Sequence, residues 1–97
     1  MQIVTLSGKI CGPCEQRKDK NGNGYIRFRV TCASKDATGG NKYTTYRCYS
    51  YDTSFSDLQN GDIVFLTGDL NIITRTDENG KTWMNVDVYV KNMTKGS

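Results

Sequence analysis

The sequence predicts an all-β protein with one small barrel or sandwich domain. Its 97 residues suffice for a single modest core but not for two. Ten glycines, one proline and runs rich in Thr, Val, Ile and Tyr are typical of short strands joined by tight turns. Apolar and polar residues alternate in several of these runs, as in strands that bury one face. We predict a domain at 1–92 and a short flexible C-terminal tail at 93–97.

Turn signals divide the chain into five strands and one short helix. Glycine-rich turns are expected at 21–24, 38–41 and 77–80, and 15–20 is a charged connecting stretch. Between 52 and 60 the apolar spacing changes to three, and Thr53 or Ser54 would cap one or two helical turns. The expected strands are 2–10, 25–32, 43–51, 63–74 and 82–90. This order, with a short helix between the third and fourth strands, is that of the OB-fold, a five-stranded Greek-key barrel.

Side chains of one parity along these strands form the expected core. Gly68 should permit a sharp bend in the long fourth strand. Phe65 and Tyr89 should point outward, either as scattered surface residues or as part of a subunit contact. The expected core residues are Ile3, Leu6, Ile10, Ile26, Phe28, Val30, Val64, Leu66, Leu70, Val86, Val88 and Val90.

The second and third strands carry aromatic and cationic side chains on the face opposite the core. These side chains are Tyr25, Arg27, Arg29, Arg47, Tyr49 and Tyr51. Rings can stack on bases and guanidinium groups can hold phosphates, so the face fits single-stranded nucleic acid. Further candidates are loop and hairpin residues, namely Lys35, Lys42, Arg75, Lys81 and Trp83.

Three alternatives to DNA binding remain open for this face. The cations could simply keep a solvated sheet soluble, while the tyrosines cover neighbouring side chains. An RNA-binding OB module could use the same stacking surface. A protein-interaction domain could also present it, because Tyr and Arg are favoured at such interfaces.

Composition argues against an enzyme. The chain has no histidine, the commonest general base, and its ten carboxylates are scattered through turns and strand ends, so we expect no catalytic residues and no cofactor. Asp69 and Asp87 are expected to pair with nearby Lys or Arg. No stretch is apolar enough to span a membrane and the N-terminus lacks a secretion signal, so we expect a cytoplasmic protein. The formal net charge of +3 is too small to indicate a partner by itself.

The four cysteines offer two further interpretations, which we consider weaker. Cys11-Gly12-Pro13-Cys14 is the dithiol sequence of thioredoxin-like enzymes, but the helix that would lower a thiol pKa is not expected after it. A disulfide between these two cysteines could form in air. A structural zinc site needs two close pairs, whereas Cys32 and Cys48 stand singly with the parity of the apolar face. We therefore expect no metal and place Cys32 and Cys48 in the core.

Ten short motifs or single residues, spread over nearly the whole chain, are informative through their order and spacing. They are Gly8-Lys9-Ile10, Glu15-x-Arg17, Asn21-Gly22, Phe28-x-Val30, Arg47, Tyr51, Gly61-Asp62-x-Val64, Gly68-x-Leu70, Asp77-x-x-Gly80 and Val86-x-Val88. In order and spacing they resemble the bacterial single-stranded DNA-binding protein family. The resemblance implies a role in DNA replication, recombination or repair, and a homotetramer or dimer. Through Leu6-Ser7-Gly8 the chain is also similar to the primosomal replication protein N group, dimeric relatives of the same fold.

The chain also departs from that family's pattern. Cys14 occupies the usual proline position, with Pro13 one residue earlier, and Thr45 occupies the position of a common tryptophan. The loop at 35–42 is shorter and lacks an aromatic residue. The sequence ends at Ser97 without the family's long flexible tail and acidic tip, so we expect either a truncated chain or a compact member that binds DNA without recruiting replication proteins through such a tail.

Overall fold

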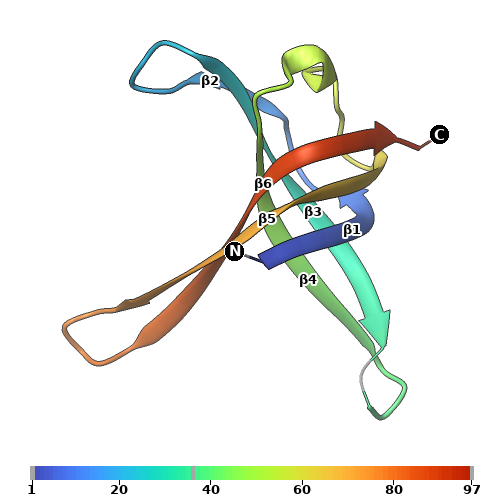
Figure 1. Ribbon diagram of the computed structural model, residues 1–97. Coiled ribbons are helices and arrows are strands. Elements are labelled where there is room, and N and C mark those ends of the chain that lie inside the picture. Colours follow the sequence, from blue (N-terminus) through green and yellow to red (C-terminus); the bar gives the residue numbers. More distant parts are fainter. Residues whose placement is uncertain (1, 36, 97) are drawn as a thin grey trace.

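The computed structural model describes residues 2–35 and 37–96, and within them the chain is all-β (Figure 1). Met1, Asp36 and Ser97, which belong to the expected domain, basic loop and tail, lie outside the described residues. One turn of 3-10 helix, η1 (Thr53–Phe55), separates the fourth and fifth strands. The strands are β1 (Gln2–Ile10), β2 (Glu15–Lys18), β3 (Gly24–Lys35), β4 (Asn41–Ser50), β5 (Ile63–Thr76) and β6 (Thr82–Lys95).

Five of the strands close into a barrel. The sheet order is β1-β5-β6-β4-β3-β2, and β1 also pairs with β3 to complete the ring. β4 and β6 run parallel, whereas the other pairs are antiparallel. The β3–β4 and β5–β6 hairpins extend beyond the barrel as two arms (Figure 1). The expected OB-fold is confirmed, with β2 added as a short edge strand.

Several element boundaries differ from those expected. Residues 15–18, expected to be a charged connection, form β2 by pairing with β3 between Glu15↔Arg27 and Lys18↔Gly24. β6 continues to Lys95 instead of ending at Val90, so residues 93–95, which we had placed in the tail, are part of the sheet. The expected helix is one 3-10 turn, and its N-cap is Asp52 instead of Thr53 or Ser54. The Asp52 carboxylate accepts hydrogen bonds from the backbone and side chain of Ser54.

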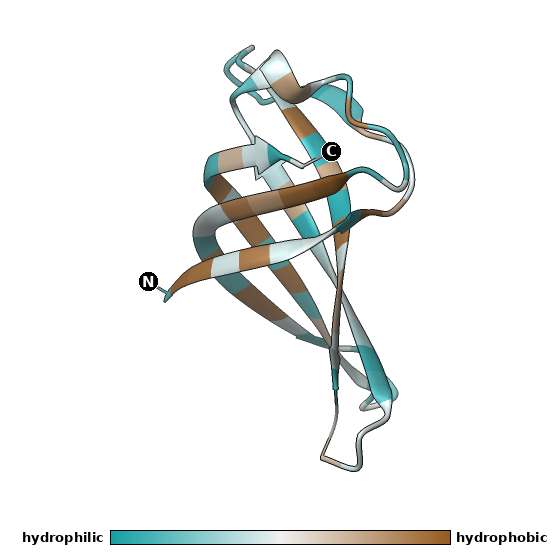
Figure 2. Cartoon of the chain, turned by 90° about the vertical axis from the view of Figure 1, so that its right-hand side faces the viewer, coloured by the Kyte–Doolittle hydropathy of each residue, from teal (hydrophilic) through white to brown (hydrophobic). Residues whose placement is uncertain are grey.

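The barrel interior holds most of the expected core. Apolar segments alternate with polar ones along the barrel strands (Figure 2). Cys48 is buried and Cys32 packs partly against the core, as expected, and Leu58 adds a buried side chain after η1. Leu70 and Val90 are only partly buried, and Val86 is half-buried outside the core cluster. The buried core residues are Leu6, Ile10, Ile26, Phe28, Val30, Cys48, Leu58, Val64, Leu66 and Val88.

Ile3 was wrongly predicted to lie in the core. Its side chain is 76% exposed, whereas Leu6 and Ile10 on the same strand are buried. Successive side chains of a strand point to opposite sides, so Ile3 and Leu6, an odd number of residues apart, cannot share a face. Beside Gly68, where we expected a bend in the strand, the β5–β6 register shifts: Thr67 lies opposite Asn92 and Gly68 lies opposite Val90, so the extra residue is on β6.

Candidate nucleic-acid interface

The predicted aromatic and cationic face lies on the outside of the barrel, across β3, β4 and β6. Strand register sets its rows: Arg27 lies opposite Tyr49, and Tyr49 lies opposite Tyr89 on β6. In the next row, Arg29 lies opposite Arg47, and Arg47 opposite Asp87. The inward-facing neighbours on these strands are core residues, which hold the backbone of the face in place.

Four tyrosines form one continuous cluster on this face, which we call the tyrosine cluster: Tyr25, Tyr49, Tyr51 and Tyr89. The ring centroids of Tyr25 lie 6.2 Å from Tyr49 and 5.7 Å from Tyr51, with tilted planes. Tyr49 stacks on Tyr89 at 5.5 Å with an interplanar angle of 25°. Tyr51 and Tyr89 are 61% and 45% exposed, so flat ring surface is open to a stacking ligand.

Hydrogen bonding and burial raise the phenol pKa values of two of these rings. Tyr51 Oη donates a 3.0 Å hydrogen bond to the Asp19 carboxylate, which raises the pKa of Tyr51. Backbone hydrogen bonds from Asn23, together with the Tyr51 bond, lower the pKa of Asp19. Partial burial, reinforced by Asp87, raises the pKa of Tyr49. Tyr49 and Tyr51 therefore keep their phenol protons around pH 7.

A carboxylate on β2 holds two of the arginines. Glu15 Oε2 accepts from Arg17 Nη2 at 2.7 Å and from Arg27 Nη2 at 2.6 Å. Hydrogen bonds from Arg17 and then Arg27 lower the pKa of Glu15, and the same carboxylate raises the pKa of Arg17. Glu15 thus stays charged at neutral pH and fixes Arg27 beside Tyr49.

Arg47 has a carboxylate partner of its own, whereas Arg29 has none among the described residues. Arg47 Nε donates a 2.9 Å hydrogen bond to Asp87 Oδ1, whose side chain is almost fully buried. Among the described residues, no carboxylate pairs with the exposed Arg29, although Arg29 lies directly opposite Arg47. A small concavity of about 140 Å³, the arginine pocket, lies beside them; it is lined by Cys11, Pro13, Glu15, Arg27, Phe28, Arg29 and Arg47.

The other predicted residues lie on the two arms, away from the tyrosine cluster. Lys35 and Lys42 stand at the end of the β3–β4 hairpin, where Lys35 pairs with Asn41 and Ser34 with Lys42. On the β5–β6 arm, Arg75 lies directly opposite Trp83, which is 42% exposed. Lys81 precedes β6, and its backbone closes the turn with Asp77. The structure thus brings together the six strand residues but not these five.

Three further side chains of this face were not singled out from the sequence. Tyr89 was predicted to face outward, but its stacking on Tyr49 depends on the parallel β4–β6 register, which no local pattern reveals. Arg17 and Glu15 belong to β2, whose charged residues gave no strand signal. Asp69 and Asp87 each form the ion pair with a basic residue that was predicted. Lys91 contacts Asp69 at 3.5 Å, and Arg47 contacts Asp87.

The thiols occupy unreactive surroundings, apart from the exposed Cys11. All four cysteines are free, and a strand, β2, follows the Cys11–Cys14 segment in place of the helix of a thioredoxin-like site. Burial raises the pKa of Cys48 to about 12 and also raises the pKa of Cys14 and Cys32.

The described residues contain no group of His, Cys, Asp and Glu side chains suited to a metal. None of the described helical segments has the length and apolarity to cross a membrane.

The family model described as the single-strand binding protein family matches residues 1–95. The chain belongs to this family. Its function is therefore the binding of single-stranded DNA, without catalysis. No curated protein sequence matches the chain at a significant level.

Three solved single-stranded DNA-binding proteins share the fold over nearly their whole length. The small single-stranded DNA-binding protein of Streptomyces coelicolor has a TM-score of 0.80 at 19% identity, covering 98% of this chain and 94% of that one. A Plasmodium falciparum protein of the family, solved with single-stranded DNA, has a TM-score of 0.73 at 15% identity, covering 100% and 96%. Mitochondrial Rim1 of S. cerevisiae has a TM-score of 0.72 at 12% identity, covering 97% and 93%. At these identities the likeness concerns the fold.

Proposed function

We propose that single-stranded DNA crosses the outer face of β3, β4 and β6, with its bases stacked on the tyrosine cluster. The observation that carries this proposal is the continuity of the cluster, in which neighbouring ring centroids lie 5.5–6.2 Å apart. Stacking on rings tolerates any base, so the binding has little sequence preference. Each ring that stacks contributes about 1–3 kcal/mol by alanine substitution.

The arginine pocket holds the phosphates in this proposal. Arg29 lies directly opposite Arg47, and Asp87 offsets the charge of Arg47 only, so the pair keeps an excess positive charge that attracts an anion. A phosphate there would offset this charge and accept charge-assisted hydrogen bonds from the two guanidinium groups. Arg27 is already placed by Glu15 on the same side of the pocket.

The two arms extend the contact at either end of the strand. Lys35 and Lys42 on one arm, and Arg75 and Lys81 on the other, provide further phosphate contacts. Trp83 lies opposite Arg75 on the outward parity of β6, which suits an additional stacking platform. These contacts require DNA longer than the tyrosine cluster alone accommodates.

Titration of fluorescent oligo-dT at several salt concentrations tests the proposal, beside a duplex and an RNA oligonucleotide of equal length. We expect preference for the single DNA strand and a log-log salt slope of about −0.7 per phosphate neutralised. Tyr49→Ala should weaken binding about 5- to 150-fold, whereas the exposed Met84→Ala on the opposite parity of β6 should not. Unchanged affinity in a folded Tyr49→Ala protein would place the bases elsewhere.

The same proposal includes a role in DNA replication, recombination or repair and an assembly of two or four copies. Ile3 and Phe65 support the assembly, because both are exposed apolar side chains on the outer side of the paired strands β1 and β5. Light scattering at micromolar concentration decides it, and a strict monomer contradicts it. A cytoplasmic location is also proposed, supported by four thiols that are all free.

A further inference from the structure

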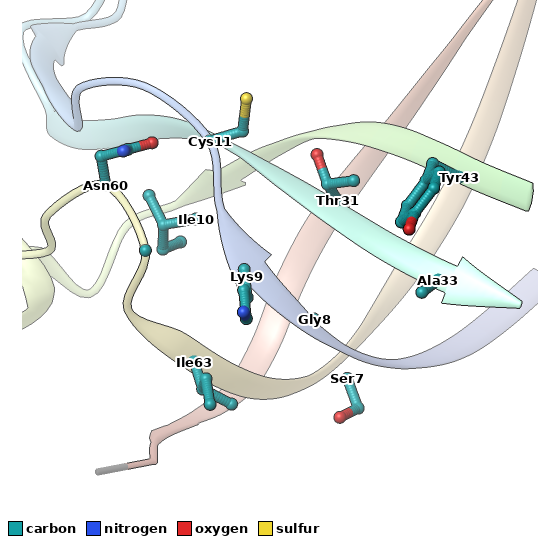
Figure 3. A pocket seen from close by; sticks show the side chains of 11 residues that line it. Ser7, Gly8, Lys9, Ile10, Cys11, Thr31, Ala33, Tyr43, Asn60 and Ile63 are labelled. Carbon is teal, nitrogen blue, oxygen red and sulfur yellow. The ribbon is translucent and has the colours of Figure 1, made fainter. Parts of the chain in front are cut away.

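A groove of about 720 Å³ lies over the seam between β1 and β3 (Figure 3). The two strands pair only at Lys9↔Thr31 and Ile10↔Val30 and then diverge, because β1 continues along β5 and β3 continues along β4. A Cβ on Gly8 would lie 2.5 Å from the carbonyl oxygen of Thr31, so the close approach of the strands requires glycine there. Beyond this crossing point the seam opens into the groove.

The groove neighbours the arginine pocket of the proposed DNA interface. Cys11 lines both hollows, so the two are separated by no more than this residue's width at that point. Along β3, Thr31 and Ala33 in the groove have the same parity as Arg29 in the pocket. A strand that leaves the arginine pocket along the β3–β4 hairpin therefore enters the groove without crossing an edge.

The ring of Tyr43 lies at the far side of this groove and contacts no other aromatic ring among the described residues. Its side chain is 65% exposed, and its cross-strand neighbour is the small residue Ala33. The preceding pair consists of Thr31 and Thr45, whose hydroxyls lie 3.1 Å apart. These short side chains leave the surface low in front of the ring, and Figure 3 shows Tyr43 beside Thr31 and Ala33.

Two lysines belong to the surface around this groove. Lys9 lines the groove from β1 and is exposed. Lys35 has the parity of Ala33, lies two pairs beyond it on the hairpin and is also exposed. Lys9 therefore shares the groove with Tyr43, and Lys35 follows on the hairpin. A ring with cations at its sides is the arrangement that binds one nucleotide by stacking its base and contacting its phosphates.

We propose that this groove is a second nucleotide subsite, in which a base stacks on Tyr43 and a phosphate contacts Lys9. The proposal rests on the proposed function, because the same strand must first occupy the tyrosine cluster. Six residues of β4 separate Tyr49 from Tyr43, which is about 20 Å at a rise of about 3.4 Å per residue. A strand with stacked bases covers that distance with about six nucleotides, and an extended strand with fewer.

Oligonucleotide length separates this subsite from the tyrosine cluster. Affinities are measured for oligo-dT of three to twelve nucleotides with the wild type, Tyr43→Ala, Tyr43→Phe and Lys9→Gln. We expect Tyr43→Ala to match the wild type on the shortest oligonucleotide and to bind the longest about 5- to 150-fold more weakly. Tyr43→Phe keeps the ring and should retain wild-type affinity. Lys9→Gln should reduce the salt slope by about 0.7 on long oligonucleotides only.

The controls distinguish failure of this subsite from failure of the interface itself. Tyr49→Ala should weaken binding at every length, which reports on the tyrosine cluster. If Tyr49→Ala weakens binding but neither Tyr43→Ala nor Lys9→Gln changes it at any length, the second subsite is refuted and the interface stands. If the wild type binds no oligo-dT, the proposed function fails first. Tyr43 and Lys9 are exposed, so both variants should keep the wild-type thermal unfolding midpoint.

Discussion

Glu15→Gln should make the protein bind single-stranded DNA more tightly. In the free protein the Glu15 carboxylate accepts hydrogen bonds from Arg17 and Arg27 at 2.7 and 2.6 Å, so a phosphate must compete with it for both guanidinium groups. The amide keeps the shape of the side chain but loses the charge. Both arginines would then be available to phosphate.

The magnitude follows from counterion release. A slope of about −0.7 per phosphate corresponds to about a fivefold gain in affinity at 0.1 M salt for each additional contact. Releasing one or both arginines should therefore raise the affinity about 5- to 25-fold and steepen the slope by about 0.7 to 1.4. The gain should be similar at every pH from 5 to 8, because the pKa of Glu15 lies below its ordinary value of 4.5 and the wild-type carboxylate stays charged.

The assay is oligo-dT titration at four or more salt concentrations. Asp57→Asn is the matched control, because it makes the same change in net charge at an exposed residue that forms no ion pair among the described residues. Equal gains in both variants would reveal a general charge effect. Weaker binding by Glu15→Gln would refute the reasoning, since it would mean that Glu15 acts mainly by positioning Arg27.

Three other results follow from the packing and the pKa shifts. Gly68→Ala should lower the unfolding free energy in urea by about 1–3 kcal/mol, because its Cβ would collide with a β6 carbonyl; unchanged stability would contradict this. At pH 8 a thiol reagent should modify exposed Cys11 quickly and Cys48, whose pKa is raised to about 12, only on unfolding. Asp19→Asn should lower the pKa of Tyr51 towards 10.0 in a tyrosinate absorbance titration, assigned with Tyr51→Phe. Folding raises the pKa of Tyr51, so the Tyr51–Asp19 hydrogen bond stabilises the folded protein fully below pH 10. This stabilisation is lost as the pH rises through the pKa of Tyr51 in the folded protein.

The strand faces could be predicted because period-two alternation is local. Arg27 and Arg29 alternate with Ile26 and Phe28, so burying one set exposes the other whatever the tertiary structure. The same rule explains why Ile3 lies outside, because its parity differs from that of the buried Leu6. On β3, where apolar and charged residues alternate without interruption, the predicted buried face is confirmed.

Other features depend on contacts between distant segments. The stacking of Tyr89 on Tyr49 needs the parallel β4–β6 register, which joins residues 40 positions apart. β2 is an edge strand made of charged and polar residues, so no buried face imposes a pattern on its sequence. The helix is shorter than the spacing of Phe55 and Leu58 predicts. Only one 3-10 turn forms, and Leu58 after it is buried. Each of these results comes from tertiary pairing that a local pattern does not encode.

The carboxylates make DNA binding an exchange of ion pairs instead of a simple gain of them. Four arginines, Arg17, Arg27, Arg29 and Arg47, lie on or beside the tyrosine cluster, and among the described residues only Arg29 lacks a carboxylate partner. Four free arginines would give a salt slope of about −2.8, whereas one gives about −0.7. For an oligo-dT of three or four nucleotides, too short to bring both arms into contact, we expect a wild-type slope closer to the smaller value. A slope near −2.8 would show that Glu15 and Asp87 release their arginines fully on binding. A shallow slope leaves stacking as the main source of affinity, so the tyrosine variants should then lose the same factor of affinity at low and high salt.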